Sequence, residues 1–285
     1  MGNRNAKGFT LIEMAVVLVI IGLLFAGVVL AQSLIRSSNV QTIISDVAMY
    51  QSAISQFKQK YNEMPGDMTD ATNNWGTNPH CSTNGVGTGT QTCNGNGNGR
   101  VDLKLLIAPF EQFLVWQHLA NGGFISGQYS GTSWPAGSPY HVVYCSPGNN
   151  CPGGRVNQSQ AYFLAYSTGS FGLLGSTANY WAQGPGHYLG VGLAGASSGY
   201  PAYPLLTAPE AFSLDSKVDD GLPGQGVWKS FEATGGAGYL PNCVVQSGTT
   251  SPPSDGSIAS EATAVYYTAY SNTLPACSFA IRMNF

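Results

Sequence analysis

Residues 7–31 decide the fold, and they read KGFTLIEMAVVLVIIGLLFAGVVLA. From Met14 to Ala31 no residue is charged, and with the apolar residues ahead of Met14 the run is long enough to span a bilayer as a helix. Arg4 and Lys7 precede it, so the N-terminus should stay cytoplasmic and the bulk of the chain should be exported. A secretory signal peptide fits less well, because its apolar core is shorter and ends in a small-residue cleavage site.

Glu13 stands at the head of this apolar run. An acid that enters a membrane is costly and is normally retained only with a partner. A glutamate that reaches back to the interface would cost little. On the residues alone, both interpretations of Glu13 stay open.

Beyond Ala31 the pattern becomes that of an amphipathic helix. Apolar residues recur at spacings of three, four and seven, and polar residues such as Asp46 fill the other faces. Pro65 and Gly66 should stop the helix. We therefore predict one helix from Phe9 to about Glu63, with its first half in lipid and its second half under a globular head. The alternative is a membrane helix joined by a linker to an unrelated domain. The apolar positions are Val40, Ile43, Ile44, Val47, Ile54, Phe57 and Tyr61.

The composition favours an exported, loop-rich β-type domain after the helix. The 285 residues include 37 glycines and 15 tyrosines, and only 9% of residues are charged. The net charge of −3 gives no electrostatic argument for nucleic-acid binding.

Six cysteines without any C-x-x-C pair indicate disulfides rather than a zinc site. An even number in an exported chain is typical of an oxidising compartment, although six cysteines allow about 15 connectivities. We expect nearest-neighbour pairing, because each loop then closes locally; one or two free thiols are the alternative. The expected pairs are Cys81–Cys93, Cys145–Cys151 and Cys243–Cys277.

The rest of the chain predicts an antiparallel sheet with two short helices. Residues 103–121 read as a helix broken or kinked near Pro109, with His118 partly exposed on it. Residues 208–221 read as a short capped helix and a turn. Short apolar and aromatic runs between turn residues predict strands at 140–145, 161–166, 227–231, 264–269 and 278–283.

Two groups of residues offer oxygen ligands for a cation such as calcium. The asparagine loop departs from an EF-hand, because Leu105 stands where the glutamate should be. For both groups we expect ordinary turn residues and solvated acids rather than a metal site. The first group is Asn94, Asn96 and Asn98; the second is Asp215, Asp219 and Asp220.

Signals for catalysis are at the level of chance. Residues 190–195 match G-x-G-x-x-G and residues 195–199 match G-x-S-x-G, which this glycine content produces roughly 0.6 and 0.5 times at random. His118, His141 and His187 have no partner placed by the sequence. We expect no catalytic residue and no cofactor.

Residues 7–14 resemble the prepilin signature of type IV pilins and type II secretion pseudopilins. The resemblance implies cleavage between Gly8 and Phe9 by a prepilin peptidase and N-methylation of Phe9. In that family the acid at the position of Glu13 pairs with the N-terminal amine of a neighbouring subunit. Such a pair is physically reasonable, because a buried carboxylate and a buried ammonium must neutralise one another.

The resemblance also implies an α+β fold and an assembly role. Residues 1–8 would be the leader, 9–64 the helix, and 65–285 a head whose segment 243–277 resembles the disulfide-bounded C-terminal loop of many pilins. The implied function is a structural subunit of a type IV pilus, inserted first in the inner membrane and then assembled with itself by a membrane platform. The alternatives are a periplasmic pseudopilin, suggested by the absence of proline before Pro65, and an anchored protein that never polymerises.

Overall fold

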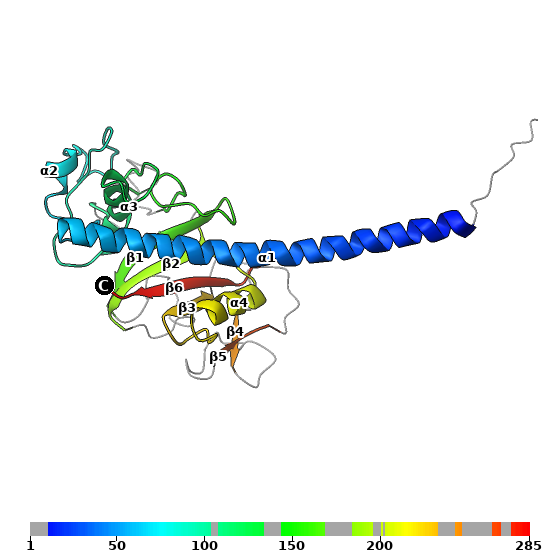
Figure 1. The fold of residues 1–285 in the computed structure, drawn as a ribbon. Coiled ribbons are helices and arrows are strands. Elements are labelled where there is room, and N and C mark those ends of the chain that lie inside the picture. Colours follow the sequence, from blue (N-terminus) through cyan, green and yellow to red (C-terminus); the bar gives the residue numbers. More distant parts are fainter. Residues whose placement is uncertain are drawn as a thin grey trace, which may run out of the picture.

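The computed structural model describes residues 11–103, 108–133, 144–168, 184–195, 201, 203–232, 243–246, 264–268 and 275–285. A long helix projects from a mixed head, and the head wraps the distal half of that helix (Figure 1). The helices are α1 (Leu11–Tyr61), α2 (Ala71–Trp75), α3 (Glu111–Asn121) and α4 (Ala208–Val218). The strands are β1 (Gln160–Ser167), β2 (Gly186–Leu193), β3 (Trp228–Glu232), β4 (Val244–Gln246), β5 (Ala264–Tyr266) and β6 (Cys277–Met283).

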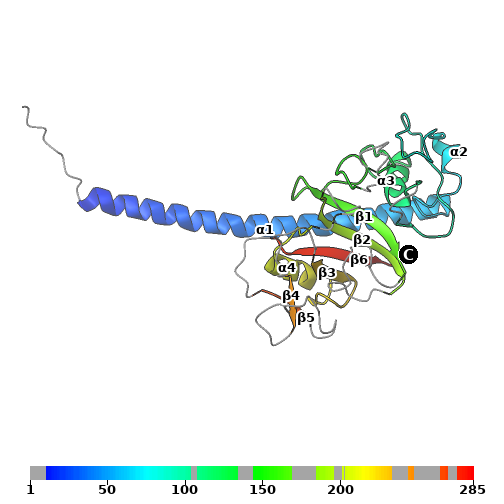
Figure 2. The same cartoon turned by 180° about the vertical axis from the view of Figure 1, so that it is seen from behind.

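The central sheet has the strand order β1-β2-β6-β3, and every pair in it is antiparallel. Phe163 of β1 lies opposite Gly190 of β2, and Leu189 of β2 lies opposite Ile281 of β6. A separate antiparallel pair, β4-β5, extends the head beyond β3 (Figure 2). The predicted α+β fold with an antiparallel sheet is confirmed.

One core joins the helix to the sheet. Tyr50 of α1 contacts Trp116 of α3, with ring centroids 5.3 Å apart, and Tyr162 of β1, with centroids 4.9 Å apart. The apolar positions predicted for the distal half of α1 enter this core, with Ile44 and Tyr61 partly covered. Because apolar side chains at helical spacing line one face, that face alone meets the head.

Helix α1 ends before Pro65 and Gly66, the two residues that were expected to stop it. Its last residue is Tyr61, and Asn62 adopts a left-handed conformation with φ 56°. Asparagine tolerates this conformation better than most residues and ends helices for that reason. The stop therefore precedes Pro65 and Gly66.

Helix α3 begins only after Pro109. The prediction of a helix across 103–121 is wrong at its start, because Leu103 and Ala108 are not helical; residues 104–107 lie outside the described residues. Proline disfavours helical conformation in the residue before it, which places the start behind the proline. Helix α4 is confirmed, and Thr207 and Glu210 form the capping box that starts it.

Four strand predictions are confirmed, at 161–166, 227–231, 264–269 and 278–283, the third of them shortened to β5. Of the strand predicted at 140–145, residues 140–143 lie outside the described residues, and Tyr144 and Cys145 belong to none of the six strands. Strand β2 was missed because its glycines read as a turn. Gly190 is required there, since a Cβ atom on it would lie 1.8 Å from the Phe163 ring.

Candidate functional site: the projecting helix

The first 28 residues of α1 stand clear of the head. Every described side chain from Leu11 to Ser38 is exposed, and Val40 is the first buried residue. Leu11 is 91% exposed and Leu34 is 72% exposed. The apolar window within α1 has a mean hydropathy of 3.0, and none of it is buried.

This projecting segment matches a membrane in length and chemistry. It is about 42 Å long, against a hydrocarbon core of about 30 Å. No charged residue stands between Glu13 and Arg36. A contiguous apolar surface of this size is not stable in water, so lipid or other protein chains must cover it.

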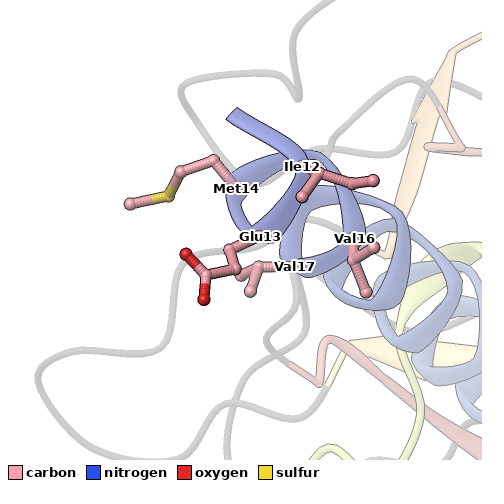
Figure 3. Close-up of a pocket in the computed structure, with 5 residues that line it drawn as sticks. All are labelled: Ile12, Glu13, Met14, Val16 and Val17. Carbon is pink, nitrogen blue, oxygen red and sulfur yellow. The ribbon is translucent and has the colours of Figure 1, made fainter. Parts of the chain in front are cut away.

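Glu13 lies in the first described turn of the helix. It is exposed, and it shares a surface pocket with Ile12, Met14, Val16 and Val17 (Figure 3). Its carboxylate points away from the helix axis, on the side of Val17. The geometry therefore presents one acid on an otherwise apolar surface. Gly8 and Phe9, the residues of the expected cleavage site, lie outside the described residues.

A buried acid ties the distal half of α1 to the sheet. Asp46 is 5% exposed, accepts a hydrogen bond of 3.0 Å from the Tyr162 hydroxyl and forms an ion pair with Arg155. Burial, reinforced by the Asp46 charge, raises the pKa of Tyr162 well above its ordinary value, so this hydroxyl remains a donor. The assignment of Asp46 to an outer polar face of the helix is therefore wrong. The sequence pattern of α1 gave no indication that Asp46 has a hydrogen-bond partner, Tyr162, in β1.

His118 belongs to α3 and contacts the loop that follows α1. Its Nδ1 accepts a hydrogen bond of 3.0 Å from the Gly66 amide, and its Nε2 lies 3.0 Å from Thr92 Oγ1 and 3.2 Å from the Cys93 carbonyl oxygen. The side chain is fully buried, so the prediction of partial exposure is wrong. Burial lowers the pKa of His118 to about 4. These contacts are structural, and they link the helix exit to the first disulfide.

His187 has a similar structural role in β2. Its Nε2 accepts a hydrogen bond of 3.1 Å from the Val101 amide. Burial lowers the pKa of His187 to about 4, and the charges of Lys58 and Arg100 act in the same direction. The glycine motif 190–195 lies mostly inside β2, so its first glycines serve strand packing; residues 196–200 and His141 lie outside the described residues.

All three nearest-neighbour disulfides are confirmed. Cys81 pairs with Cys93, Cys145 with Cys151, and Cys243 with Cys277, and no cysteine is free. The third bond closes a separation of 34 residues and joins β6 to the residue before β4. Such bonds are typical of exported domains.

The carboxylate of Asp67 holds the backbone of the asparagine loop. The Asp67 carboxylate accepts hydrogen bonds from the amides of Gly97, Asn98 and Gly99, at 2.7, 3.2 and 2.7 Å. The amide oxygens of all three candidate asparagines accept backbone N–H bonds as well. Their donors are Thr72 for Asn94, Asn98 for Asn96, and Arg100 for Asn98.

The three aspartates at the end of α4 do come together. One oxygen from each of Asp215, Asp219 and Asp220 lies within 4.8 Å of the others. Asp215 is fully buried, so the expectation of solvated turn acids is wrong for it. Burial raises the pKa of Asp215 to about 7, and the charges of Asp220 and Asp219 add to the rise, while the Tyr266 hydroxyl opposes it.

Comparison with known proteins identifies the N-terminal segment. A family model described as the prokaryotic N-terminal methylation motif matches residues 3–29. That motif is the signature of type IV pilins and pseudopilins, so the N-terminal segment of this chain carries the signature of such a precursor. The matched residues include the expected cleavage site and the apolar start of α1, and no part of the head. No curated protein and no solved structure matches the chain.

Proposed function

We propose that this protein is a structural subunit of a type IV pilus and that it assembles through the projecting part of α1. The observation that carries the proposal is a methylation motif that overlaps an exposed apolar helix, which no described residue of the head covers. Before assembly, lipid of the inner membrane would cover this helix. In the filament, the same segments of neighbouring subunits would cover one another.

Processing at Gly8 prepares the subunit for assembly. A prepilin peptidase would cut before Phe9, and methylation would follow on the new amine. That cut removes Arg4 and Lys7, which hold the leader on the cytoplasmic side. An inner-membrane platform would then extract the subunit into the growing filament.

Glu13 gives the apolar bundle its axial register. A carboxylate inside such a bundle is strongly destabilising unless a cation neutralises it. The amine of Phe9 on a neighbouring subunit is the cation that the processed chain supplies. Because Phe9 and Glu13 are only four residues apart in the sequence, their pairing would fix how far one subunit is displaced along the other.

The head would form the outer shell of the filament. It is held to α1 by the Tyr50 ring contacts and the Asp46–Tyr162 hydrogen bond. Three disulfides suit exposure outside the cytoplasm. The 15 tyrosines of the chain favour adhesive contacts, since tyrosine is enriched at protein interfaces. We infer that the protein acts by assembly and not by catalysis.

A pseudopilin of a type II secretion or DNA-uptake machine is the second candidate. The feature that favours it is the absence of proline from residues 9–64, where many type IV pilins carry one. A pseudopilin would share the cleavage, the methylation and the Glu13 pair. It would differ in forming a short periplasmic fibre instead of a surface filament.

Electron microscopy of material sheared from the surface of the native host, with mass spectrometry of the same fraction, separates these possibilities. A pilus subunit is expected in abundant filaments as a chain that begins at methylated Phe9. A chain processed at Gly8 but confined to the envelope, without filaments, would replace the pilus by the pseudopilin. A chain that keeps its first eight residues would contradict both assembly functions and indicate an anchored protein.

A further inference from the structure

The end of α4 carries three carboxylates, and Lys217 is the basic residue of its last turn. Asp215 lies in that turn, Asp219 is the residue that caps its end, and Asp220 follows. The C-terminal end of a helix already carries a partial negative charge, so carboxylates there are disfavoured. No lysine, arginine or histidine among the described residues forms an ion pair with any of the three.

Asp215 has an oxygen that is buried without a partner. Its Oδ2 accepts a hydrogen bond of 2.9 Å from the Tyr266 hydroxyl, but its Oδ1 is buried and accepts none from the described residues. A buried polar atom left unpaired costs about 1–3 kcal/mol, and more when it is charged. Such an atom is retained where something else satisfies it, and this one belongs to a carboxylate beside two others.

The other two acids each use one oxygen to hold the loop that leads to β3. Asp219 Oδ2 accepts hydrogen bonds from the amides of Val227 and Trp228, and Asp220 Oδ1 accepts one of 2.8 Å from the Leu222 amide. No hydrogen bond to Asp219 Oδ1 or Asp220 Oδ2 occurs within the described part of the chain. In each of the three aspartates, one carboxylate oxygen therefore accepts a hydrogen bond, and the other oxygen is available to bind a cation.

We propose that Asp215, Asp219 and Asp220 form a calcium-binding site at the end of α4. Three carboxylates offer hard oxygen ligands only, which selects calcium or magnesium over transition metals. Calcium binds oxygen at about 2.3–2.6 Å, so two ligands on opposite sides of the ion lie about 4.6–5.2 Å apart. The oxygens here lie within 4.8 Å of one another. Magnesium requires a stricter octahedral arrangement with ligands at about 2.0–2.1 Å, whereas calcium accepts irregular oxygen sites of this kind.

Calcium at this position would fasten three elements together. Asp215 reaches β5 through Tyr266, and Asp219 reaches β3 through its amide contacts. Helix α4 itself contacts α1, β3 and β5 (Figure 2). The bound ion would therefore stabilise the part of the head that carries the Cys243–Cys277 bond. The proposal does not depend on the filament function.

The test uses the full-length protein in detergent after removal of divalent ions with EDTA. Calorimetric titration with calcium chloride is expected to give a Kd on the order of 10⁻⁴–10⁻³ M. At a tenfold excess of free calcium over Kd, the unfolding temperature should rise by about 3–6 °C. Magnesium chloride at the same concentration should give less than half of that rise.

Asp220→Asn is the decisive variant, because an asparagine can still accept the Leu222 hydrogen bond on an exposed position. It should weaken calcium binding at least tenfold. The matched control is Asp70→Asn, an exposed acid at the start of α2 that makes no cap hydrogen bond, and it should bind calcium like the wild type.

Three results would overturn the calcium site. The first is the absence of both heat and a temperature shift up to 10 mM calcium chloride. The second is an equal loss of calcium affinity in Asp220→Asn and Asp70→Asn. The third is an equal rise of the unfolding temperature with magnesium chloride, which would indicate charge screening alone. Asp215→Asn adds an independent check, since it should remove the calcium response; a full response in that variant would also exclude the site.

Discussion

Glu13 is a single acid at the start of a surface that carries no other charge up to Arg36. Glu13→Ala should abolish filament assembly, because the Phe9 amine of a neighbour would then be buried without a counter-charge. Membrane insertion should persist, since removing a charge favours the apolar environment. The measurement compares chain in the sheared fraction with chain in the membrane fraction.

Two further variants make the Glu13 experiment specific. Glu13→Gln keeps the shape of the side chain and removes only its charge, so it should fail like Glu13→Ala. Gln32→Ala changes an exposed polar residue of the same segment and should assemble normally. Normal filament yield from Glu13→Gln would show that the charge has no role in assembly.

His118 makes the stability of the head depend on pH. Burial lowers its pKa to about 4 in the folded state, whereas an unfolded histidine titrates near 6.5. Between these values the unfolded chain binds the extra proton, so stability is complete above about pH 6.5 and falls as the pH drops toward 4. His118 should contribute a loss of up to roughly 3 kcal/mol over this window.

Denaturant unfolding of the protein at a series of pH values between 7.5 and 4.5 measures this dependence. His118→Gln should flatten the curve, although it also lowers stability at pH 7.5 by disturbing the Gly66 and Thr92 contacts. The exposed His80→Gln variant removes one histidine without touching the core and should keep the wild-type slope. An unchanged slope in His118→Gln would contradict the assignment. His187 should add to this slope, whereas Asp215, whose pKa burial raises to about 7, keeps its proton in the folded state and should oppose it.

At the scale of elements, the attachment of α1 to β1 depends on a polar contact inside an apolar stripe. Asp46→Ala leaves the Tyr162 hydroxyl buried without its acceptor and Arg155 without its partner. We expect a loss of about 2–4 kcal/mol in the free energy of unfolding. Chemical denaturation of the full-length protein measures it. Gln41→Ala, on an exposed face of the same helix, should change stability by less than about 0.5 kcal/mol, and equal losses in the two variants would contradict a specific role for Asp46.

Elements with a local signal could be predicted from the sequence. The apolar run and the amphipathic repeat predicted α1, and the pattern of a short capped helix in residues 208–221 predicted α4. Short apolar and aromatic runs between turn residues predicted β1 and β6. Nearest-neighbour pairing of the cysteines was correct because each loop closes over a short separation. These features depend on residues that are close along the chain.

Elements defined by distant partners were missed. Gly190 and Gly192 look like turn residues, yet they belong to a strand. The Phe163 ring of β1 and the backbone oxygens of Pro201 and Tyr203 occupy the space that their side chains would need. Asp46 and Asp215 look solvated until Tyr162 and Tyr266 are placed beside them. The periodicity of a sequence reports which residues are apolar, and it carries no information on which polar residue meets a partner far along the chain.

At the scale of the whole molecule, folding and assembly use separate parts of one helix. None of the described side chains of residues 11–38 is buried, while the core takes α1 residues from Val40 onward. The two parts meet near Arg36, which lies 3.9 Å from Glu210 of α4. The head therefore has what it needs to fold without the projecting segment, and the projecting segment remains free to exchange lipid for neighbouring helices.

This division predicts that a chain of residues 36–285 folds as a soluble monomer. It removes the apolar surface and keeps every buried residue of α1, so its unfolding temperature should match that of the full-length protein within about 3 °C. Light scattering after gel filtration, without detergent, should give a single species of monomer mass. A chain that starts at residue 48 is the matched control: it lacks Val40, Ile43, Asp46 and Val47 and should be unfolded or aggregated. Aggregation or a large loss of stability in the 36–285 chain would show that the head depends on the projecting helix, and folding and assembly would then be coupled.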